Sequence, residues 1–250
     1  NGTPATAKYK PTVVGVTPSA TEATSTKEQG ATQEATVSFT PGKATIGTAE
    51  KSVPMDPNAY KLLGGQEGKT PLDTVPAMSE DGTKQVGTYT IKVVDGKPVV
   101  TFTPTDKTYV GKLKPVTVQG KDTNGTETTT TYTPTVTEVR PEGTNVGSEG
   151  IQGAPQSGTP TFTSGHENVT MTISETNPAK LVVDGQPVAD TTIPAKDAQG
   201  QQVGTYTIEP ATGKVTFTPN PGFTGTPVPA TVEAKNSNGT PATATYTPVV

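Results

Sequence analysis

The chain has 250 residues, among them 25 Pro, 27 Gly and 52 Thr, with no Cys, no Trp and a single His. Reactive side chains are scarce and strand and turn formers abound, which disfavours an enzyme. The net charge is −4 without a basic cluster, so no nucleic-acid partner is expected. With no run of about 18 apolar residues and no leader pattern, we expect neither a membrane span nor a signal peptide in this segment.

One stretch of thirteen residues recurs along the chain. It opens the sequence as NGTPATAKYKPTV, returns as NGTETTTTYTPTV and closes it as NGTPATATYTPVV, headed by Asn1, Asn124 and Asn238. Spacings of 123 and 114 residues (124 − 1 and 238 − 124) are of domain size, whereas solenoid repeats are shorter. We therefore predict two tandem domains, each long enough to bury a core.

The first repeat contains a predicted hairpin in GTYTIKVVDGKPVVTFTP, residues 87–104. A turn is expected at Asp95-Gly96 because such a pair favours a two-residue hairpin loop. Alternation places five apolar residues on one face of this hairpin: Tyr89, Ile91, Val93, Val100 and Phe102. The pattern predicts an antiparallel pair with one buried face.

The second repeat contains a similar sequence at residues 204–219, with a turn expected around Thr212-Gly213. The retained apolar set is Tyr206, Ile208, Val215 and Phe217. A further strand is predicted in ENVTMTISE, with Val169, Met171 and Ile173 facing inward. No segment has helical periodicity, and Pro and Gly interrupt most windows. Many short strands predict antiparallel β-sandwiches of immunoglobulin-like class.

The recurring stretch is predicted to be the second arm of a hairpin. After an Asn238-Gly239 turn, Ala242, Ala244 and Tyr246 return alongside Val232 and Ala234. In the middle copy, the predicted partners of Val116 and Val118 are Thr128, Thr130 and Tyr132. The stretch thus closes the domain before it. We assign 1–13 to the last strand of a preceding repeat, 14–136 to a first sandwich and 137–250 to a second.

Two consequences follow from this phasing. Residues 1–13 lack their hairpin partner, so we expect them not to form the strand that their counterparts form. The next domain is expected to begin within a few residues of Tyr132, because no Gly/Ser-rich spacer follows it, and Pro134 is expected to lead into that domain. A short junction that contains proline favours a semi-rigid, end-to-end arrangement.

Two motifs resemble ligand-binding loops but depart from the required patterns. GGQEGKT at 64–70 ends like a phosphate-binding loop, but Leu63 stands where that motif needs its first Gly. DTNG at 122–125 begins like a calcium loop, but its Gly is fourth rather than sixth, and the second copy reads NSNG. An exposed loop explains the first motif, and a hairpin turn explains both copies of the second.

The remaining polar candidates also favour surface roles. His166 has no Ser or Cys constellation, and Glu80-Asp81 lie in a polar turn whose counterpart reads DAQGQ. Asn-x-Thr sequons are expected by chance in a Thr-rich chain; they begin at Asn1, Asn124, Asn168 and Asn238. A covalent bond between a Lys and an Asn side chain within the chain stays as an alternative, to which no residues are assigned. We expect no catalytic, metal-binding or cofactor-binding residues.

NPGFTGTPVPATVEAKNSNGTPATATYTP, with GTYTI and VTFTP upstream, resembles the CshA-type fibril repeat of streptococcal cell-wall-anchored surface adhesins. The resemblance covers both repeats; the first is more divergent, with TDKTYVGKLKPVTVQGKDTNGTETTTTYTP in the same place. It implies a tandem array on the surface of a Gram-positive cell, anchored to the wall beyond this segment and presenting a separate adhesive region.

The resemblance therefore implies an extracellular stalk whose partners are neighbouring repeats, with any host-matrix or bacterial surface partner bound elsewhere in the protein. Two alternatives stay open. The repeats themselves could bind host protein or glycan, although seven Tyr, five Phe and no Trp supply few exposed platforms. The chain could instead be a disordered spacer, because apolar residues are few.

Overall fold

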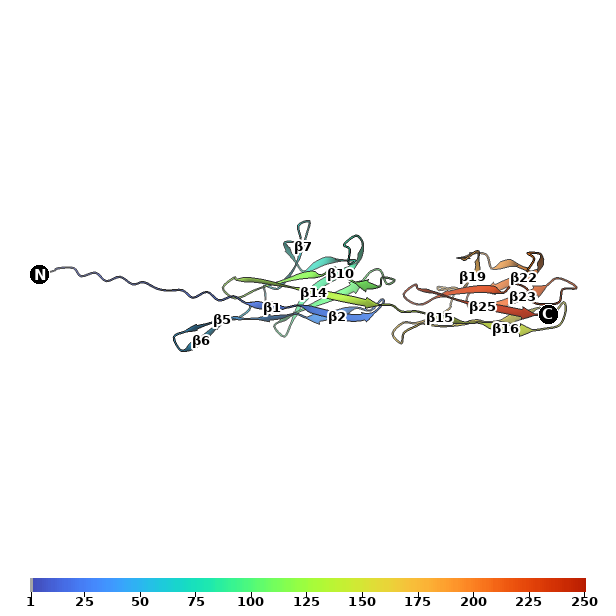
Figure 1. Ribbon diagram of the computed structural model, residues 1–250, viewed down its shortest axis with the longest axis horizontal. Helices are drawn as coiled ribbons and strands as arrows, with labels where there is room; N and C mark the ends of the chain where they lie inside the picture. The colour runs from blue at the N-terminus through green and yellow to red at the C-terminus, as the bar shows by residue number, and fades with distance from the viewer. Residues whose placement is uncertain (1) are drawn as a thin grey trace. The chain divides into compact units, whose positions relative to one another are not determined.

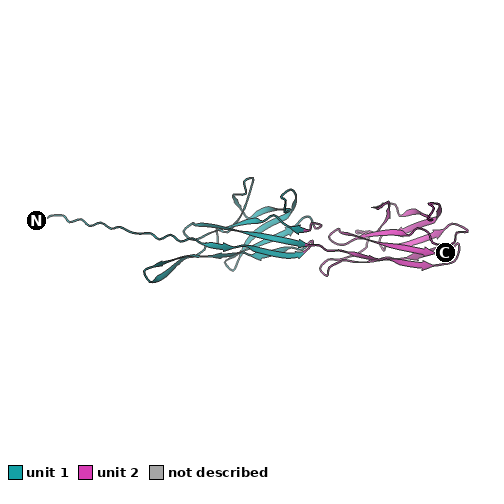
Figure 2. Ribbon diagram, in the orientation of Figure 1, with its two compact units in different colours: residues 1–27, 31–106, 111–136 teal, residues 28–30, 107–110, 137–250 magenta. Residues whose placement is uncertain are grey.

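The computed structural model describes residues 2–250, and every regular element in that range is a strand. These residues include no helix that could span a membrane. The chain forms two compact units (Figure 2). Unit 1 comprises the residues up to 27, 31–106 and 111–136, and unit 2 comprises 28–30, 107–110 and 137–250.

Unit 2 is a sandwich of two main sheets (Figure 1). One sheet has the order β17 (Gln156–Gly158), β23 (Lys214–Pro219), β22 (Gln202–Glu209), β21 (Thr192–Lys196). The other has the order β16 (Val146–Glu149), β25 (Pro241–Val249), β24 (Ala230–Lys235), β19 (Lys180–Val183), β20 (Gln186–Pro187). β15 (Glu142–Thr144) pairs with β18 (Thr161–Thr163). β16 runs parallel to β25, whereas the other pairs are antiparallel.

Unit 1 repeats this plan. One sheet has the order β3 (Gln33–Thr36), β11 (Lys97–Pro104), β10 (Gln85–Val94), β9 (Thr74–Met78). The other has the order β12 (Gly111–Lys112), β14 (Glu127–Thr137), β13 (Val116–Lys121), β7 (Lys61–Gly64), β8 (Thr70–Leu72), and β2 (Ala23–Glu28) also pairs with β14. β1 (Ser19–Thr21) pairs with β4 (Ser38–Thr40), and β5 (Gly42–Ile46) forms a hairpin with β6 (Ala49–Val53).

The predicted central hairpins are confirmed in both units. Tyr89 pairs with Phe102 across β10 and β11, and Tyr206 pairs with Phe217 across β22 and β23. These side chains are buried, and their rings contact one another. One detail is wrong: Val93 is 45% exposed, because it pairs with Pro98 near the hairpin tip, beyond the core.

The glycine of the GTYTI motif in both hairpins is required for a steric reason. These glycines, Gly87 and Gly204, lie where a Cβ atom would come within 2.4 Å of a backbone oxygen of the paired strand, that of Thr103 or Thr218. The Phe ring of the same strand packs over each glycine. Only glycine allows this close approach without a shift of the backbone.

The closing hairpins also have the predicted registers. Val118 lies opposite Thr130, and Val232 lies opposite Ala244. Pro134 does not lead into the next domain, however, because β14 continues through Pro134 to Thr137 and β25 continues through Pro248. Proline is tolerated there because its φ fits an extended strand and its carbonyl still accepts: Leu113 N donates to Pro134 O.

The strand predicted at 169–173 is also wrong, since these residues form no ladder. Neighbouring polar groups satisfy their backbone instead: Thr170 N donates to the Ser237 hydroxyl, and the Asn177 amide donates to Thr172 O. Side-chain bonds of this kind compete with sheet pairing. The corresponding zone of unit 1 holds the β5–β6 hairpin, so the two repeats differ most here.

The segment at residues 2–17 pairs with no strand in the described structure and runs extended (Figure 1). Tyr9 and Val13 are 90% and 92% exposed. The first residue of the predicted remnant, Asn1, lies outside the described residues.

Candidate functional site

The hairpin turn at the start of each closing strand is organised by one buried side chain. Asp122 Oδ1 accepts from the backbone N of Asn124 at 2.9 Å and of Thr126 at 2.8 Å. In the second copy, Asn236 Oδ1 accepts from the backbone N of Asn238 at 3.1 Å and of Thr240 at 3.0 Å. The DTNG segment and its NSNG counterpart are therefore Asx-type turns and not calcium loops.

The two turns differ at the other side-chain atom. Asn236 Nδ2 donates to Ser164 O at 3.2 Å, whereas Asp122 Oδ2 is buried without a hydrogen-bond partner in the structure. Asp122 and Asn236 are 2% and 3% exposed. Within residues 2–250, no group of three or more His, Cys, Asp or Glu side chains could hold a metal ion. Unit 1 thus contains an unsatisfied acceptor that unit 2 avoids.

A buried polar network that the sequence did not reveal is present in both units. In unit 1, Ser25 Oγ donates to Gln33 Oε1 at 2.7 Å, and Gln33 Nε2 donates to Thr135 O at 3.0 Å. Since Ser25 uses its proton there, the Tyr132 hydroxyl, 2.7 Å away, donates to Ser25 Oγ. Every member is satisfied, so the network fixes the position of the closing strand.

Unit 2 repeats this network atom for atom. Ser148 Oγ donates to Gln156 Oε1 and lies 2.7 Å from the Tyr246 hydroxyl, while Gln156 Nε2 donates to Val249 O at 2.9 Å. A signal existed in the sequence, because EQGATQ and IQGAPQ align at these glutamines. It could not be interpreted without knowing that Ser, Gln and Tyr meet in space.

Burial also changes the acidity of these tyrosines. Desolvation raises the pKa of Tyr206 well above its usual range, with a smaller contribution from Tyr246. Desolvation likewise raises the pKa of Tyr246 and of Tyr132, opposed in each case by the hydrogen bond with a serine. The hydroxyls are therefore proton donors within the core, not nucleophiles.

Alkaline pH is expected to destabilise both units. The folded-state pKa values lie above the unfolded value of about 10, so the unfolded chain loses its tyrosine protons first. This contribution to stability is fully present below about pH 10 and falls as pH rises further. Urea midpoints at pH 8 and 11 should differ, and the difference should shrink in Tyr246→Phe; equal pH sensitivity in that variant would contradict the assignment.

The other polar candidates occupy ordinary turns. Residues 64–70 join β7 to β8 as a hairpin, not a strand followed by a helix. The Asp81 carboxylate accepts from the Ser79 hydroxyl and from the backbone N and hydroxyl of Thr83, and these bonds lower the pKa of Asp81, the Ser79 bond most. His166 Nδ1 accepts from Asn168 N at 3.2 Å.

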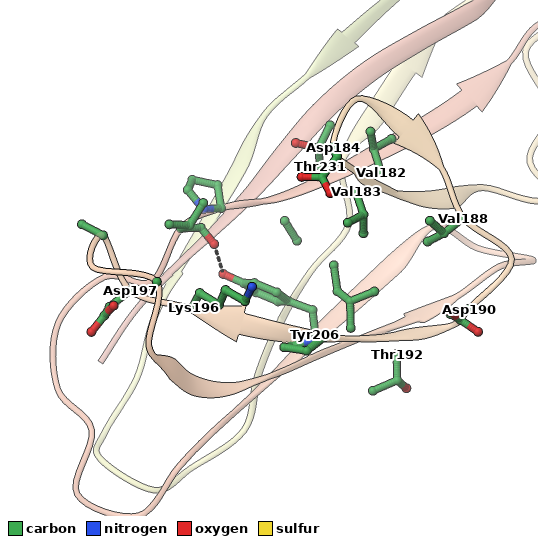
Figure 3. Close-up of a pocket in the computed structure, with 17 residues that line it drawn as sticks. Val182, Val183, Asp184, Val188, Asp190, Thr192, Lys196, Asp197, Tyr206 and Thr231 are labelled. Atoms are coloured by element: carbon green, nitrogen blue, oxygen red, sulfur yellow. Dashed lines mark hydrogen bonds between the residues drawn. The ribbon is translucent and has the colours of Figure 1, made fainter.

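One groove occurs at the same place in both units. In unit 2 it has a volume of about 590 Å³ and lies between β21 and the β19–β20 hairpin, over Tyr206, whose hydroxyl donates to Val228 O (Figure 3). In unit 1 it has about 370 Å³ and lies over Tyr89. The charged residues along the unit 2 groove are Asp184, Asp190, Lys196 and Asp197, whereas Lys114 alone is charged in unit 1.

The strands beside these grooves are sheet edges, and each contains a proline. Pro76 and Pro194 lie in β9 and β21, and Pro71 and Pro187 lie in β8 and β20. A proline cannot donate a ladder hydrogen bond, so these edges are poor templates for another strand. The grooves are therefore not suited to strand addition.

These features define the class: a tandem β-sandwich repeat protein, with the same core and polar network built twice. The family model of the surface adhesin CshA repetitive domain matches residues 15–136 and 138–250. The chain belongs to this family, and the membership implies a cell-surface protein. The expected resemblance is confirmed.

Three solved structures are among those to which this chain is similar. The I9–I11 tandem of titin is 12% identical (93% of this chain, 66% of that chain, TM-score 0.32). Mouse cadherin-23 EC22–24 is 13% identical (94%, 64%, 0.31), and a tetra-tandem repeat in the extending region of a large adhesion protein is 15% identical (93%, 48%, 0.27). The chain thus spans no more than 66% of these structures. No curated protein sequence matches it.

Proposed function

We propose that this chain is a stalk segment of a fibrillar surface adhesin. One observation carries the proposal: the two repeats share their buried core and polar networks but not the charges along their grooves. A ligand site would keep the polar groups that recognise the ligand, whereas a spacer needs only the groups that hold its fold. What recurs in this chain is structural.

We propose the repeat boundaries 14–136 and 137–250, with residues 1–13 as the last strand of a preceding repeat. The family matches begin at 15 and 138, which supports this phasing. The stalk is proposed to be extracellular, to belong to a Gram-positive and specifically streptococcal cell, and to be attached to the wall through a region outside this chain. It would hold a distal adhesive region, which carries the host-matrix or bacterial partners, away from the surface.

A non-enzymatic role follows from the same comparison. The polar residues considered for catalysis lie in turns: Asp81 and Asp197 of the corresponding turn accept local backbone hydrogen bonds, and Lys43 stands at the position of His166 in the first repeat. A direct binding assay of the chain against host-matrix proteins and glycans separates a passive stalk from a binding module. Of the aromatic side chains in residues 2–250, only that of Tyr9 is largely exposed, which favours the stalk.

Small-angle scattering tests the spatial role. A sandwich about a dozen residues long spans about 40 Å at about 3.3 Å per residue, so two in tandem should extend roughly 80 Å, plus the opening segment. Insertion of a Gly/Ser linker after Thr137 is the matched control and should broaden the distance distribution. A compact globule for the unmodified chain would contradict the stalk.

A further inference from the structure

Unit 2 includes a turn that lies far upstream of its strands in the sequence. Residues 28–30 belong to this compact unit, as the colours of Figure 2 show. The turn reads Glu-Gln-Gly and recurs as Ile-Gln-Gly at residues 151–153. Gly30 and Gly153 have φ values of 80° and 79°, so the glycine has the same left-handed conformation in both copies. We call this element the Gln-Gly turn.

Gln29 anchors the upstream turn within unit 2. Its side-chain amide is bonded at both ends: Oε1 accepts from Val139 N at 2.7 Å, and Nε2 donates to Thr108 O at 2.7 Å. Its backbone N donates to Thr137 O at 2.9 Å. Gln29 is only 3% exposed, and burial of an amide costs free energy unless the amide is paired in this way. One residue thus joins three segments of the unit.

Asn238, which heads the last copy of the recurring thirteen-residue stretch, bonds the carbonyl of this turn. Its Nδ2 donates to Gln29 O at 2.7 Å, and its carboxamide lies where a Cβ atom on Gly30 would collide with it. The hairpin turn itself does not require asparagine here, because Asn238 does not have a positive φ and the acceptor within the turn is Asn236 Oδ1. The Asn238 side chain therefore serves the Gln-Gly turn.

We propose that the Asn-Gly turn of one repeat recognises the Gln-Gly turn of the repeat before it, and that Asn238 and Gln29 are the pair that carries this contact. The inference rests on the proposed repeat boundary between residues 136 and 137, which puts the Gln-Gly turn in the first repeat and the Asn-Gly turn in the second. It deepens the proposed stalk by naming the group that is recognised: the carbonyl of a glutamine that a left-handed glycine follows.

Glu28 gives the contact a second part that is not repeated along the chain. Its side chain is 13% exposed, and its Oε1 accepts from Asn168 Nδ2 at 3.0 Å. The corresponding residues of the other repeat are Ile151 for Glu28 and Thr45 for Asn168, both 123 residues apart. An isoleucine cannot accept this hydrogen bond. The Gln29 contact is therefore general, because both repeats contain its residues, whereas the Glu28 contact is specific for this pair of repeats.

Hydrogen exchange of single amides in the full chain, followed by NMR, tests the contact between Asn238 and Gln29. Asn238→Ala removes the donor to Gln29 O, so the Gln29 and Val139 amides should exchange about three- to tenfold faster, the change that one lost hydrogen bond produces. Asn124→Ala makes the same substitution at the same turn position in unit 1, where the residue is exposed, and should leave both amides unchanged. Unchanged protection in Asn238→Ala, or equal acceleration in Asn124→Ala, overturns the proposal.

Two glycine variants test the same contact from the other side. Gly30→Ala and Gly153→Ala both place a side chain at a left-handed φ, so the backbone strain is similar. Only a Cβ atom on Gly30 meets Asn238, because nothing lies within 4 Å of one on Gly153. Gly30→Ala should therefore lower the unfolding midpoint of unit 2 by more than Gly153→Ala does, and the difference should disappear when Asn238→Ala is added. Effects that simply add overturn the contact.

Glu28→Ile separates the two parts of the contact, because it gives the turn the sequence of residues 151–153. The variant loses the bond to Asn168 but keeps Gln29, so the Val139 amide should stay protected to within about twofold, whereas Gln29→Ala should accelerate its exchange at least about tenfold. Equal losses in the two variants overturn the assignment of the general contact to Gln29. These measurements report local bonds and not the extension of the chain, so a failed stalk is recognised separately by scattering.

Discussion

Tyr246→Ala is expected to lower the free energy of unfolding of unit 2 by about 3–5 kcal/mol, the range for truncating a large buried aromatic residue. Its ring is fully buried, it contacts the Tyr206 ring, and its hydroxyl completes the network with Ser148 and Gln156. The variant leaves a cavity and an unsatisfied polar pair together. Of the substitutions considered for unit 2, we expect this one to have the largest effect.

Calorimetry of the full chain measures this effect, because unit 1 serves as an internal reference. Tyr132→Ala is the mirror variant and should destabilise unit 1 by a similar amount, since Tyr132 contacts Tyr89 and Ser25 in the same way. Tyr246→Phe keeps the ring and should cost only about 1–3 kcal/mol for the lost hydrogen bond. Equal losses for the Phe and Ala variants would show that packing contributes little.

The single substitutions Asp122→Asn and Asn236→Asp are expected to have opposite effects on the stability of their units. Asp122→Asn should stabilise unit 1, because the amide nitrogen replaces a buried oxygen that has no partner and can donate as Asn236 does to Ser164 O. Asn236→Asp should destabilise unit 2 for the same reason. Leaving a buried polar group unsatisfied costs about 1–3 kcal/mol, and more for a charged group, which sets the magnitude.

Urea unfolding of both variants at pH 7 measures the change in stability that each substitution causes. Asp190→Asn makes the same change in net charge as Asp122→Asn at an exposed position, and it should leave stability within about 0.5 kcal/mol of the parent. If both exchanges destabilised their units, the turn would depend on its local neighbours rather than on the amide itself. Pro41 aligns with Ser164, so a carbonyl acceptor is expected at the corresponding place in unit 1.

Much of the fold was predictable because it is encoded by local, repeated patterns. The alternation around Tyr89 and Phe102 and the Asp95-Gly96 turn predicted the central hairpin, and the structure has both residues of that turn at positive φ. The hairpin registers around Val118 and Val232 followed from the same rule of two-residue alternation. In each case the partner strand is the next one along the chain.

The errors arose where the hydrogen-bond partners were not those that the alternating pattern implied. Residues 169–173 alternate like a strand, but Ser237 and Asn177 hydrogen-bond their backbone, so no ladder forms. Pro134 looked like a boundary, but the carbonyl it offers to Leu113 keeps it within β14. A period-two pattern reports only which side chains prefer burial, not which groups supply the hydrogen bonds.

The sequence alone determined that two similar β domains follow one another, where their hairpins turn and which residues face inward, because these properties depend on periodicity and turn chemistry within a few residues. The tertiary structure alone decided which strands become neighbours, that Ser25, Gln33 and Tyr132 share one network, and that Asp122 retains an unsatisfied oxygen. Those outcomes join residues up to 107 positions apart. Hydrogen bonds and burial over such separations depend on how the sheets stack, and no local pattern records that.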